Sequence, residues 1–241
     1  MITNGPIFNQ IKSKSENNIR QIAVLIDPDK IRDKKLEETA ELIEQSNADY
    51  IFVGGSCIFS DIDKCVEIIK LHSNKPVILF PGSHLHISQK ADAILLLSLI
   101  SGRNPEYLIG NHISAVPKLY DSKLEIISTA YILIDGGKQS SVQYVSNTQP
   151  IPADKTDIVI STAIAGEMTG NKLIYLEAGS GAINPVPDII ISEVNKFCNI
   201  PLIVGGGIKN SNETDKKHNA GANIIVIGSA IEENPEILKN L

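Results

Sequence analysis

Residues 201–229 read PLIVGGGIKNSNETDKKHNAGANIIVIGS, in which two short apolar runs each end in glycine and enclose one polar segment. The apolar runs are continuous in Ile, Leu and Val rather than alternating with polar residues, which is typical of parallel strands buried on both faces. Parallel neighbours need a crossover connection, usually a helix, and the polar segment can supply it. This stretch therefore predicts a strand–helix–strand unit.

The same pattern recurs along the whole chain. Eight apolar runs lie at residues 21–27, 50–55, 76–82, 93–100, 125–135, 172–179, 201–207 and 223–229. Segments of helical periodicity separate most of them: DKKLEETAELIEQS (33–46) places Leu36, Ala40 and Ile43 on one face, and in SDIDKCVEIIKLHS (60–73) Ser60 is the expected N-cap. Eight strand–helix repeats predict a (β/α)8 TIM barrel, with a doubly wound open sheet as the competing arrangement.

Two connections depart from the regular repeat. The segment PGSHLHISQKAD (81–92) is too short and too polar for a full crossover helix, so the helix after the third strand is expected to be shortened or missing. The connection between the fifth and sixth strands is long, and it holds Gly136-Gly137 before the apolar helix pattern TDIVISTAIAGEMTG (156–170). Long loops on the C-terminal face of a barrel are commonly lids or substrate walls. We expect one barrel domain over residues 1–241.

Composition and charge narrow the classes of protein. The chain has 241 residues, a net charge of −6, 5% aromatic residues and no tryptophan. Nucleic acid is not an expected partner, because affinity for phosphate backbones comes from clustered Lys and Arg. The sequence shows neither an apolar run of about 18 residues, as a transmembrane segment needs, nor the apolar core of a signal peptide at its start. An odd number of cysteines, three, favours free buried thiols and a cytoplasmic location.

Residues that could take part in catalysis or ligand binding cluster where the strands end, which is where barrel enzymes build their active sites. The first strand ends in DPDK (27–30), and the Asp27 carboxylate fixed there suits a hard cation such as Mg²⁺. An ordinary Asp-Pro turn explains the same residues equally well. The second strand ends in GGS (54–56), where the Ser56 hydroxyl could bind a metal or phosphate oxygen, or the residues could simply form a turn.

The last three strands all end in glycine clusters, at YLEAGSG (175–181), GGG (205–207) and GS (228–229). Glycine loops after the last strands of a barrel form a phosphate site, because backbone N–H groups and positive helix ends favour an anion. Phosphate binding is the strongest inference from the residues alone, and glycines that merely turn strand into helix are the alternative. Glu177 could accept a proton from an alcohol or hold substrate hydroxyls, or it could bond backbone amides in a structural role.

Taken together, LIDPDK, FVGGS, LFPGS, YLEAGSGA, VGGGI and VIGSAIEE resemble the geranylgeranylglyceryl phosphate synthases and their heptaprenylglyceryl phosphate relatives. The resemblance runs from about Ile22 to Glu232, and it matches the larger, archaeal-type branch, since the smaller bacterial branch has Lys where this chain has Leu25. It implies a barrel prenyltransferase of phospholipid biosynthesis. Such an enzyme joins sn-glycerol 1-phosphate to a polyprenyl diphosphate of the geranylgeranyl type, forming an ether-linked prenylglyceryl phosphate and diphosphate.

The resemblance also implies roles for individual residues. Asp27 and Ser56 would hold Mg²⁺, which assists departure of the diphosphate, and Glu177 would accept the proton of the glycerol 3-hydroxyl, so that Asp27 and Glu177 are the expected catalytic residues. The residues expected to bind glycerol 1-phosphate are Tyr175, Leu176, Glu177, Ala178, Gly179, Ser180, Gly181, Gly206, Gly207, Gly228 and Ser229. AILLLSLI (93–100) and EYLIGNHI (106–113) would line an apolar groove for the prenyl tail where a full helix is missing.

Two other functions stay open at this point. A sugar-phosphate isomerase or aldolase shares the phosphate loops, and Asp27 with Glu177 could serve as its acid–base pair. A non-catalytic regulator that senses a glycerol phosphate would need a basic surface, which the dispersed lysines do not indicate. Family members are dimers or larger assemblies, so we expect a homo-oligomer, a dimer or hexamer, with EYLIGNHISAVPKLY (106–120) as a candidate contact and a membrane-bound product.

Overall fold

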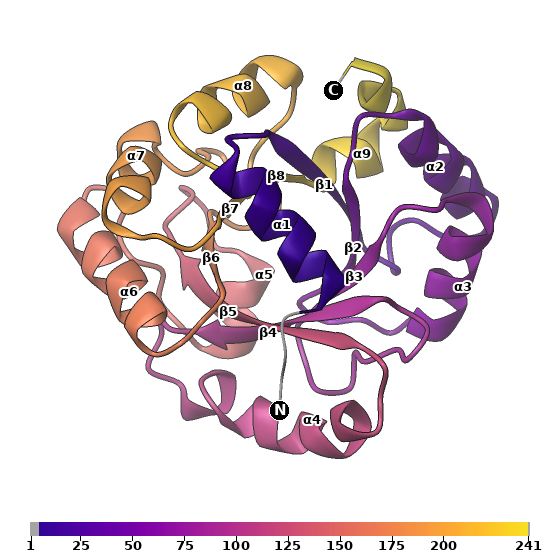
Figure 1. Cartoon of the computed structure of the whole chain (residues 1–241), viewed down its shortest axis with the longest axis horizontal. Helices are drawn as coiled ribbons and strands as arrows, with labels where there is room; N and C mark the ends of the chain where they lie inside the picture. Colours follow the sequence, from indigo (N-terminus) through magenta and orange to yellow (C-terminus); the bar gives the residue numbers. More distant parts are fainter. Residues whose placement is uncertain (1–4, 241) are drawn as a thin grey trace.

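The computed structural model describes residues 5–240, which form a closed barrel of parallel strands ringed by helices (Figure 1). Each strand pairs with the next, and the last pairs with the first through Gln21–Ile224 and the following residues. The strands are β1 (Gln21–Ile26), β2 (Tyr50–Gly55), β3 (Val77–Pro81), β4 (Ala93–Leu99), β5 (Glu125–Leu133), β6 (Leu173–Glu177), β7 (Leu202–Gly205) and β8 (Ile224–Ile227). The barrel prediction is confirmed, and the open-sheet alternative was wrong.

Six helices surround the barrel: α2 (Asp33–Gln45), α3 (Ile62–His72), α4 (Gly110–Tyr120), α6 (Thr156–Met168), α7 (Asp188–Phe197) and α8 (Ser211–Asn219) (Figure 1). The short elements α9 (Ser229–Glu233) and η2 (Pro235–Asn240) follow β8. The expected cap of α3 was wrong by one residue: Asp61, not Ser60, accepts hydrogen bonds from the backbone N–H groups of Asp63 and Lys64. A carboxylate is the stronger acceptor beside a helix N-terminus.

Both irregular connections are confirmed. Residues 82–92 run from β3 to β4 without a helix, so this part of the barrel wall lacks its usual outer cover. The next connection is also unusual, because η1 (Pro105–Tyr107) precedes α4. Between β5 and α6 an additional short helix, α5 (Ser141–Ser146), lies in the long loop. The missing helix, η1 and α5 therefore all lie in the connections that follow β3, β4 and β5.

The core has two layers that follow from the alternation of side chains along each strand. In β2, Tyr50 and Phe52 point into the barrel, whereas Ile51 and Val53 pack against the surrounding helices. All four side chains are fully buried. Burial on both faces explains why the strands read as continuous apolar runs.

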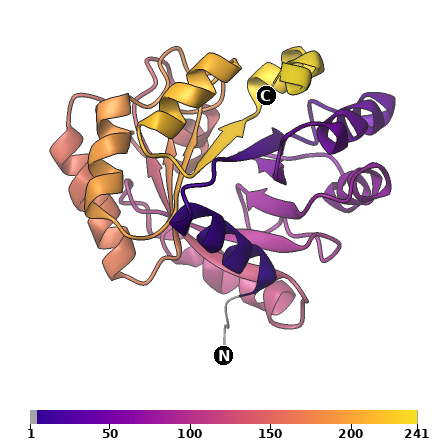
Figure 2. The ribbon, with the colours of Figure 1, turned by 45° about the horizontal axis from the view of Figure 1, so that its top comes forward.

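A helix that the sequence did not predict, α1 (Pro6–Glu16), closes the N-terminal end of the barrel (Figures 1 and 2). Its Ile7, Phe8 and Ile11 pack on the inner layer. The Glu125 carboxylate accepts hydrogen bonds from the backbone N–H groups of Ile7 and Phe8, both at 2.8 Å. These contacts satisfy donors at the start of the helix that would otherwise lack partners.

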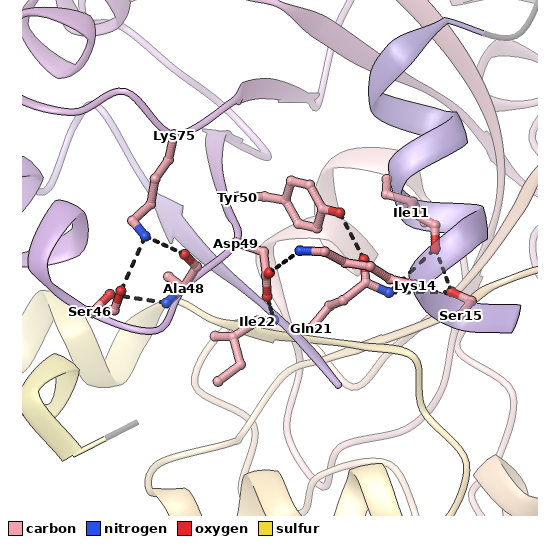
Figure 3. Close-up of polar contacts among 10 residues, drawn as sticks. All are labelled: Ile11, Lys14, Ser15, Gln21, Ile22, Ser46, Ala48, Asp49, Tyr50 and Lys75. Carbon is pink, nitrogen blue, oxygen red and sulfur yellow. Dashed lines mark hydrogen bonds and ion pairs between the residues drawn. The ribbon is translucent and has the colours of Figure 1, made fainter. Parts of the chain in front are cut away.

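Polar side chains at the same end join α1 to the strands (Figure 3). The Gln21 amide accepts from the Tyr50 hydroxyl at 2.8 Å and donates to the Ser15 hydroxyl at 3.3 Å. Lys14 lies 2.5 Å from the Asp49 carboxylate, whose second oxygen accepts the Ile22 N–H at 2.8 Å. The N-terminal end of the barrel is thus closed and structural, which leaves the opposite end for ligands.

Two expectations drawn from composition are tested by the structure. Within residues 5–240 we find no helix with the length and apolarity that a membrane crossing requires. Cys65 and Cys198 are buried free thiols as expected, but Cys57 is exposed, because it follows the end of β2 in an open loop.

Candidate active site

The C-terminal ends of the strands surround a polar cavity of about 540 Å³. All but three of the predicted site residues line it, namely Asp27, Ser56, Tyr175, Glu177, Ser180, Gly181, Gly206, Gly207, Gly228 and Ser229. The exceptions are Leu176, Ala178 and Gly179, which lie between lining residues in the segment from Tyr175 to Gly181. Leu176 and Ala178 point outward into the helix-facing core layer, as the two-residue period of a strand requires, and Gly179 contributes a backbone N–H instead. Contact through the side chains of Leu176 and Ala178 is therefore excluded.

Glu177, the last residue of β6, is a buried carboxylate at the floor of this cavity. Its Oε1 accepts a hydrogen bond of 2.7 Å from the Gly179 N–H. Burial raises the pKa of Glu177 to about 7, because a low-dielectric setting disfavours the charged form. The carboxylate is thus anchored by the backbone and has a pKa near neutral pH, which is compatible with both the structural and the acid–base interpretation of Glu177.

The Tyr175 hydroxyl points into the cavity beside Glu177 and has no hydrogen-bond partner within residues 5–240. Burial and the nearby Glu177 carboxylate raise the pKa of Tyr175 well above its ordinary value, so the hydroxyl keeps its proton. Buried polar atoms normally have partners, and an orphan in a cavity indicates a place for a ligand atom or water.

Close packing around Glu177 requires glycine on the neighbouring strand end. Gly206 has a φ of +88°, and a Cβ there would lie 2.5 Å from Glu177 Oε1. Any other residue would push the carboxylate out of place and would be strained in this conformation. The glycines after β7 therefore turn the chain and also leave the space that the Glu177 carboxylate occupies.

The loops after β6 and β8 meet across the cavity. The Ser180 and Ser229 hydroxyls are 3.1 Å apart, and Ser229 begins α9 directly after Gly228. Gly181, with a φ of +62°, faces the same point, since a Cβ there would lie 3.9 Å from Ser229 Oγ. Two hydroxyls thus converge beside glycines of two strand ends, as expected for a phosphate site.

On the opposite side of the cavity, one oxygen of Asp27 forms part of a turn and the other faces the cavity lining. Its Oδ1 accepts the Asp29 N–H at 2.9 Å, while its Oδ2 lies 3.6 Å from Lys30 Nζ and points toward the loop that carries Ser56. Asp29 is committed to the loop after β2, because its oxygens accept the N–H groups of Phe59 and Ser60. Asp27 is therefore the carboxylate with remaining acceptor capacity at this strand end.

A second cavity, narrow and apolar, opens beside the polar one at β3, β4 and α4. It has a volume of about 90 Å³, and its walls include Ile94, Leu97 and Leu99 from β4 together with His112 and Ala115 from α4. The two cavities share five lining residues: Gly55, Ser56, Phe80, Tyr131 and Val142. The apolar cavity thus begins at the polar mouth and continues outward where the helix after β3 is missing.

Aromatic rings form the boundary between the two cavities. Phe80 stacks on Tyr175 with ring centroids 5.2 Å apart and meets Tyr131 edge-on at 5.8 Å. Tyr131 and Tyr175 are themselves 5.3 Å apart. A ligand that extended from the polar to the apolar cavity would pass these ring faces.

The sequence did not single out several of the lining residues. Lys30 and Lys138 border the polar cavity, and Phe80 and Tyr131 border both. Phe80 could have been found at the end of its strand, next to Pro81. Lys138 follows Gly136-Gly137 after β5, a glycine pair of the same kind that marks the phosphate loops. Lys30 lies in the DPDK segment itself, 2.9 Å from Glu232 of α9.

A model of the PcrB family matches residues 15–241 of the chain. The chain belongs to the PcrB family. Among similar PcrB proteins, one from Zunongwangia profunda, named geranylgeranylglyceryl phosphate synthase, is 51% identical, with 94% of this chain and 97% of the relative covered. One of the same name from Pyrococcus furiosus is 41% identical, with 95% and 90% covered.

A similar solved structure has the same fold. It is the (S)-3-O-geranylgeranylglyceryl phosphate synthase of Thermoplasma acidophilum in complex with its substrate sn-glycerol-1-phosphate, with a TM-score of 0.91 and 34% identity. The match covers 97% of this chain and 94% of that one. An N-acetylmannosamine-6-phosphate 2-epimerase from Clostridium perfringens, at 16% identity and a TM-score of 0.60, shares the fold alone.

Proposed function

We propose that this PcrB-family protein is a prenyltransferase that joins sn-glycerol 1-phosphate to a polyprenyl diphosphate and releases diphosphate. One observation carries the proposal: a polar mouth with glycine–serine loops and a buried carboxylate opens directly into an apolar cavity. A sugar-phosphate isomerase or aldolase would use the polar half alone and has no need of an apolar cavity. The names of the similar proteins support the same function.

The acceptor would lie on the β6–β8 side of the mouth. Its phosphate would accept hydrogen bonds from the Ser180 and Ser229 hydroxyls and from backbone amides near Gly206 and Gly228. Its 3-hydroxyl would then face Glu177 at the end of β6. Holding the hydroxyl there converts an encounter between two substrates into a reaction of positioned groups.

The donor would place its diphosphate near Asp27 and its tail in the apolar cavity. Mg²⁺ keeps several waters and is commonly bound by one or two carboxylates plus substrate phosphates, so Asp27, with the Ser56 hydroxyl in the same cavity, fits it. Within residues 5–240 no three His, Cys, Asp or Glu side chains gather as a metal cage. Diphosphate oxygens and waters would therefore complete the coordination. When bound, Mg²⁺ neutralises charge that develops on the departing diphosphate.

In the transfer step, the bond between the allylic C1 and the diphosphate oxygen breaks, and C1 bonds to the glycerol 3-hydroxyl oxygen. The hydroxyl proton passes to the Glu177 carboxylate, which the raised pKa suits to hold it. Positive charge develops on the allylic carbon as the diphosphate leaves. The ring faces of Phe80 and Tyr131, where the two cavities meet, would stabilise that charge through cation–π attraction.

The proposal is tested by incubating labelled sn-glycerol 1-phosphate with prenyl diphosphates of several lengths, with and without Mg²⁺. We expect organic-soluble label with at least one donor, and loss of that product when Mg²⁺ is chelated. A matched incubation with unphosphorylated glycerol should give no product, because the phosphate loops would then hold nothing. Absence of organic-soluble product with every donor would end the prenyltransferase proposal.

A further inference from the structure

Lys138 carries an ammonium group directly over the loops to which the acceptor phosphate is assigned. A Cβ built on Gly181 would lie 3.2 Å from Lys138 Nζ and 3.9 Å from Ser229 Oγ. The ammonium and the serine hydroxyl therefore both lie close to one point beside Gly181. Lys138 comes from a third strand end, after β5, and was not among the residues expected to bind the acceptor.

The backbone just before Lys138 is fixed by the packing of two loops, while the Lys138 side chain is exposed. The Gly136 carbonyl accepts hydrogen bonds from the N–H groups of Ile183 and Asn184, both at 3.0 Å. A side chain at Gly136 would collide with the Ala178 carbonyl, so only glycine allows this approach. Asp135 Oδ1 accepts the Gly137 N–H at 2.9 Å and fixes the turn before Lys138. The loop after β5 is thereby held against the loop after β6.

Three lysines line the mouth, namely Lys30, Lys138 and Lys209, which follows the glycines after β7. The charge environment of Lys138 differs from that of Lys30 on the other side of the mouth. Lys30 is already paired, with Glu232 at 2.9 Å and Asp27 at 3.6 Å. Lys138 makes no hydrogen bond or ion pair with any residue in the 5–240 range. Because five carboxylates line the cavity, at Asp27, Asp29, Glu177, Glu232 and Glu233, an anionic acceptor needs a local positive charge on its own side of the mouth.

We propose that the Lys138 ammonium binds the phosphate of the glycerol phosphate acceptor by donating a charge-assisted hydrogen bond to one of its oxygens. Lys138 thereby determines acceptor affinity, and its charge contributes to the preference for a phosphorylated acceptor over free glycerol. The proposal rests on the proposed function for its substrate. Its geometry requires no contact with the diphosphate of the donor, which lies near Asp27.

The test compares Lys138→Met, which keeps the aliphatic stem, with Lys138→Arg, which keeps the charge. Lys123→Met is the matched control, since Lys123 is an exposed lysine at the opposite end of β5. With saturating donor, we expect Lys138→Met to raise the KM for glycerol 1-phosphate about tenfold, as for a charged hydrogen bond partly exposed to solvent. The KM of Lys138→Arg for glycerol 1-phosphate should stay within about threefold of the wild-type value. The KM of Lys123→Met should equal the wild-type value. The KM for the prenyl donor should not change.

Calorimetric binding of glycerol 1-phosphate, and of inorganic phosphate as a probe, gives a second readout that needs no turnover. We expect Lys138→Met to weaken both affinities about tenfold. If wild type binds these anions and Lys138→Met weakens them while no donor is turned over, the Lys138 assignment stands and the proposed function fails. Unchanged affinities and acceptor KM in folded Lys138→Met, or a raised KM for the donor alone, would overturn the assignment.

Discussion

At the residue scale, Glu177 combines burial with one backbone hydrogen bond, and the two oppose each other in setting its charge. Burial dominates and raises the pKa of Glu177 to about 7, although the Gly179 N–H favours the ionised form. A base of this pKa is half ionised at neutral pH and still basic enough to accept a proton from a reacting alcohol.

We therefore expect kcat to rise with pH up to about 7 and then to level off, because Glu177 must be ionised to act as the base. Glu177→Gln should lower kcat by about 100-fold or more, with little change in the KM for either substrate. The measurement is a pH–rate profile at saturating substrates. Full turnover by Glu177→Gln, or a profile without an inflection near 7, would remove Glu177 as the base.

The same shift predicts the pH dependence of stability. The pKa of Glu177 is higher in the folded protein, about 7, than its ordinary value of 4.5, so the folded state binds the proton more tightly. Its contribution is fully present below pH 4.5 and is lost as pH rises to about 7. Denaturation midpoints of wild type and Glu177→Gln should therefore diverge over this range in favour of Gln. Parallel midpoints would contradict the shift.

Asp27 is the residue on which we expect the metal requirement to depend. Asp27→Asn removes the charge but keeps the shape, so the Mg²⁺ concentration for half-maximal rate should rise about tenfold or more. Asp61→Asn is the control, because Asp61 caps α3 and does not line the mouth. An Asp27→Asn enzyme with the Mg²⁺ profile of wild type would exclude Asp27 as a ligand.

Most of the candidate site was predictable at this scale, because buried strands and the glycine-rich segments that follow them are readable from composition. The side chains of Leu176 and Ala178 point away from the cavity, because alternate residues of a strand face opposite sides, and a motif of consecutive residues does not carry that information. Lys138 was missed because its place depends on the loop after β5 packing against the loop after β6. Such contact between distant segments leaves no periodic signal.

At the element scale, the missing helix after β3 and the helix α4 together create the apolar cavity. The eight strands and the missing helix could be predicted from short polar and apolar runs. The helix α1 could not be predicted, because it is stabilised by packing on the end of the barrel. That contact is a property of the assembled fold rather than of the segment.

If this cavity holds the prenyl tail, Ala115→Phe should exclude long donors before short ones. Ala115 lies on the inner face of α4 and is not among the residues shared with the mouth. We expect kcat/KM for a 20-carbon donor to fall at least tenfold relative to a 10-carbon donor, as for loss of several buried methylene groups. Ser114→Phe, on the exposed side of the helix, is the control. Equal effects on both donors would place the tail elsewhere.

At the scale of the whole molecule, the two ends of the barrel differ: one is closed and contributes to stability, and the other carries the candidate site. The N-terminal end is sealed by α1 (Figure 2). The C-terminal end carries the cavities. Phe8→Ala should thus lower the free energy of unfolding by about 3 kcal/mol, with kcat/KM in the folded enzyme nearly unchanged. Phe59→Ala is the control, since the Phe59 side chain is 89% exposed. Loss of activity in the folded Phe8→Ala enzyme would show that the ends are coupled.

The outer face of α4 is the surface on which we expect a second copy of the chain to pack. Ile109, Ile113, Val116 and Tyr120 form an exposed stripe, each more than half exposed. A contiguous apolar stripe of this kind commonly marks a protein interface, because burying it gains hydrophobic free energy. The inner face of the same helix lines the apolar cavity, so association would also brace the wall of the tail site.

Light scattering coupled to size-exclusion chromatography should give an oligomer for wild type and a monomer for Ile113→Glu/Val116→Glu, because two buried carboxylates per subunit would oppose association. Met168→Glu, at an exposed apolar residue at the end of α6, should keep the wild-type mass. If bracing matters, the double variant should also lose activity with long donors more than with short ones. A monomeric wild type, or a double variant of unchanged mass, would exclude α4 as the interface.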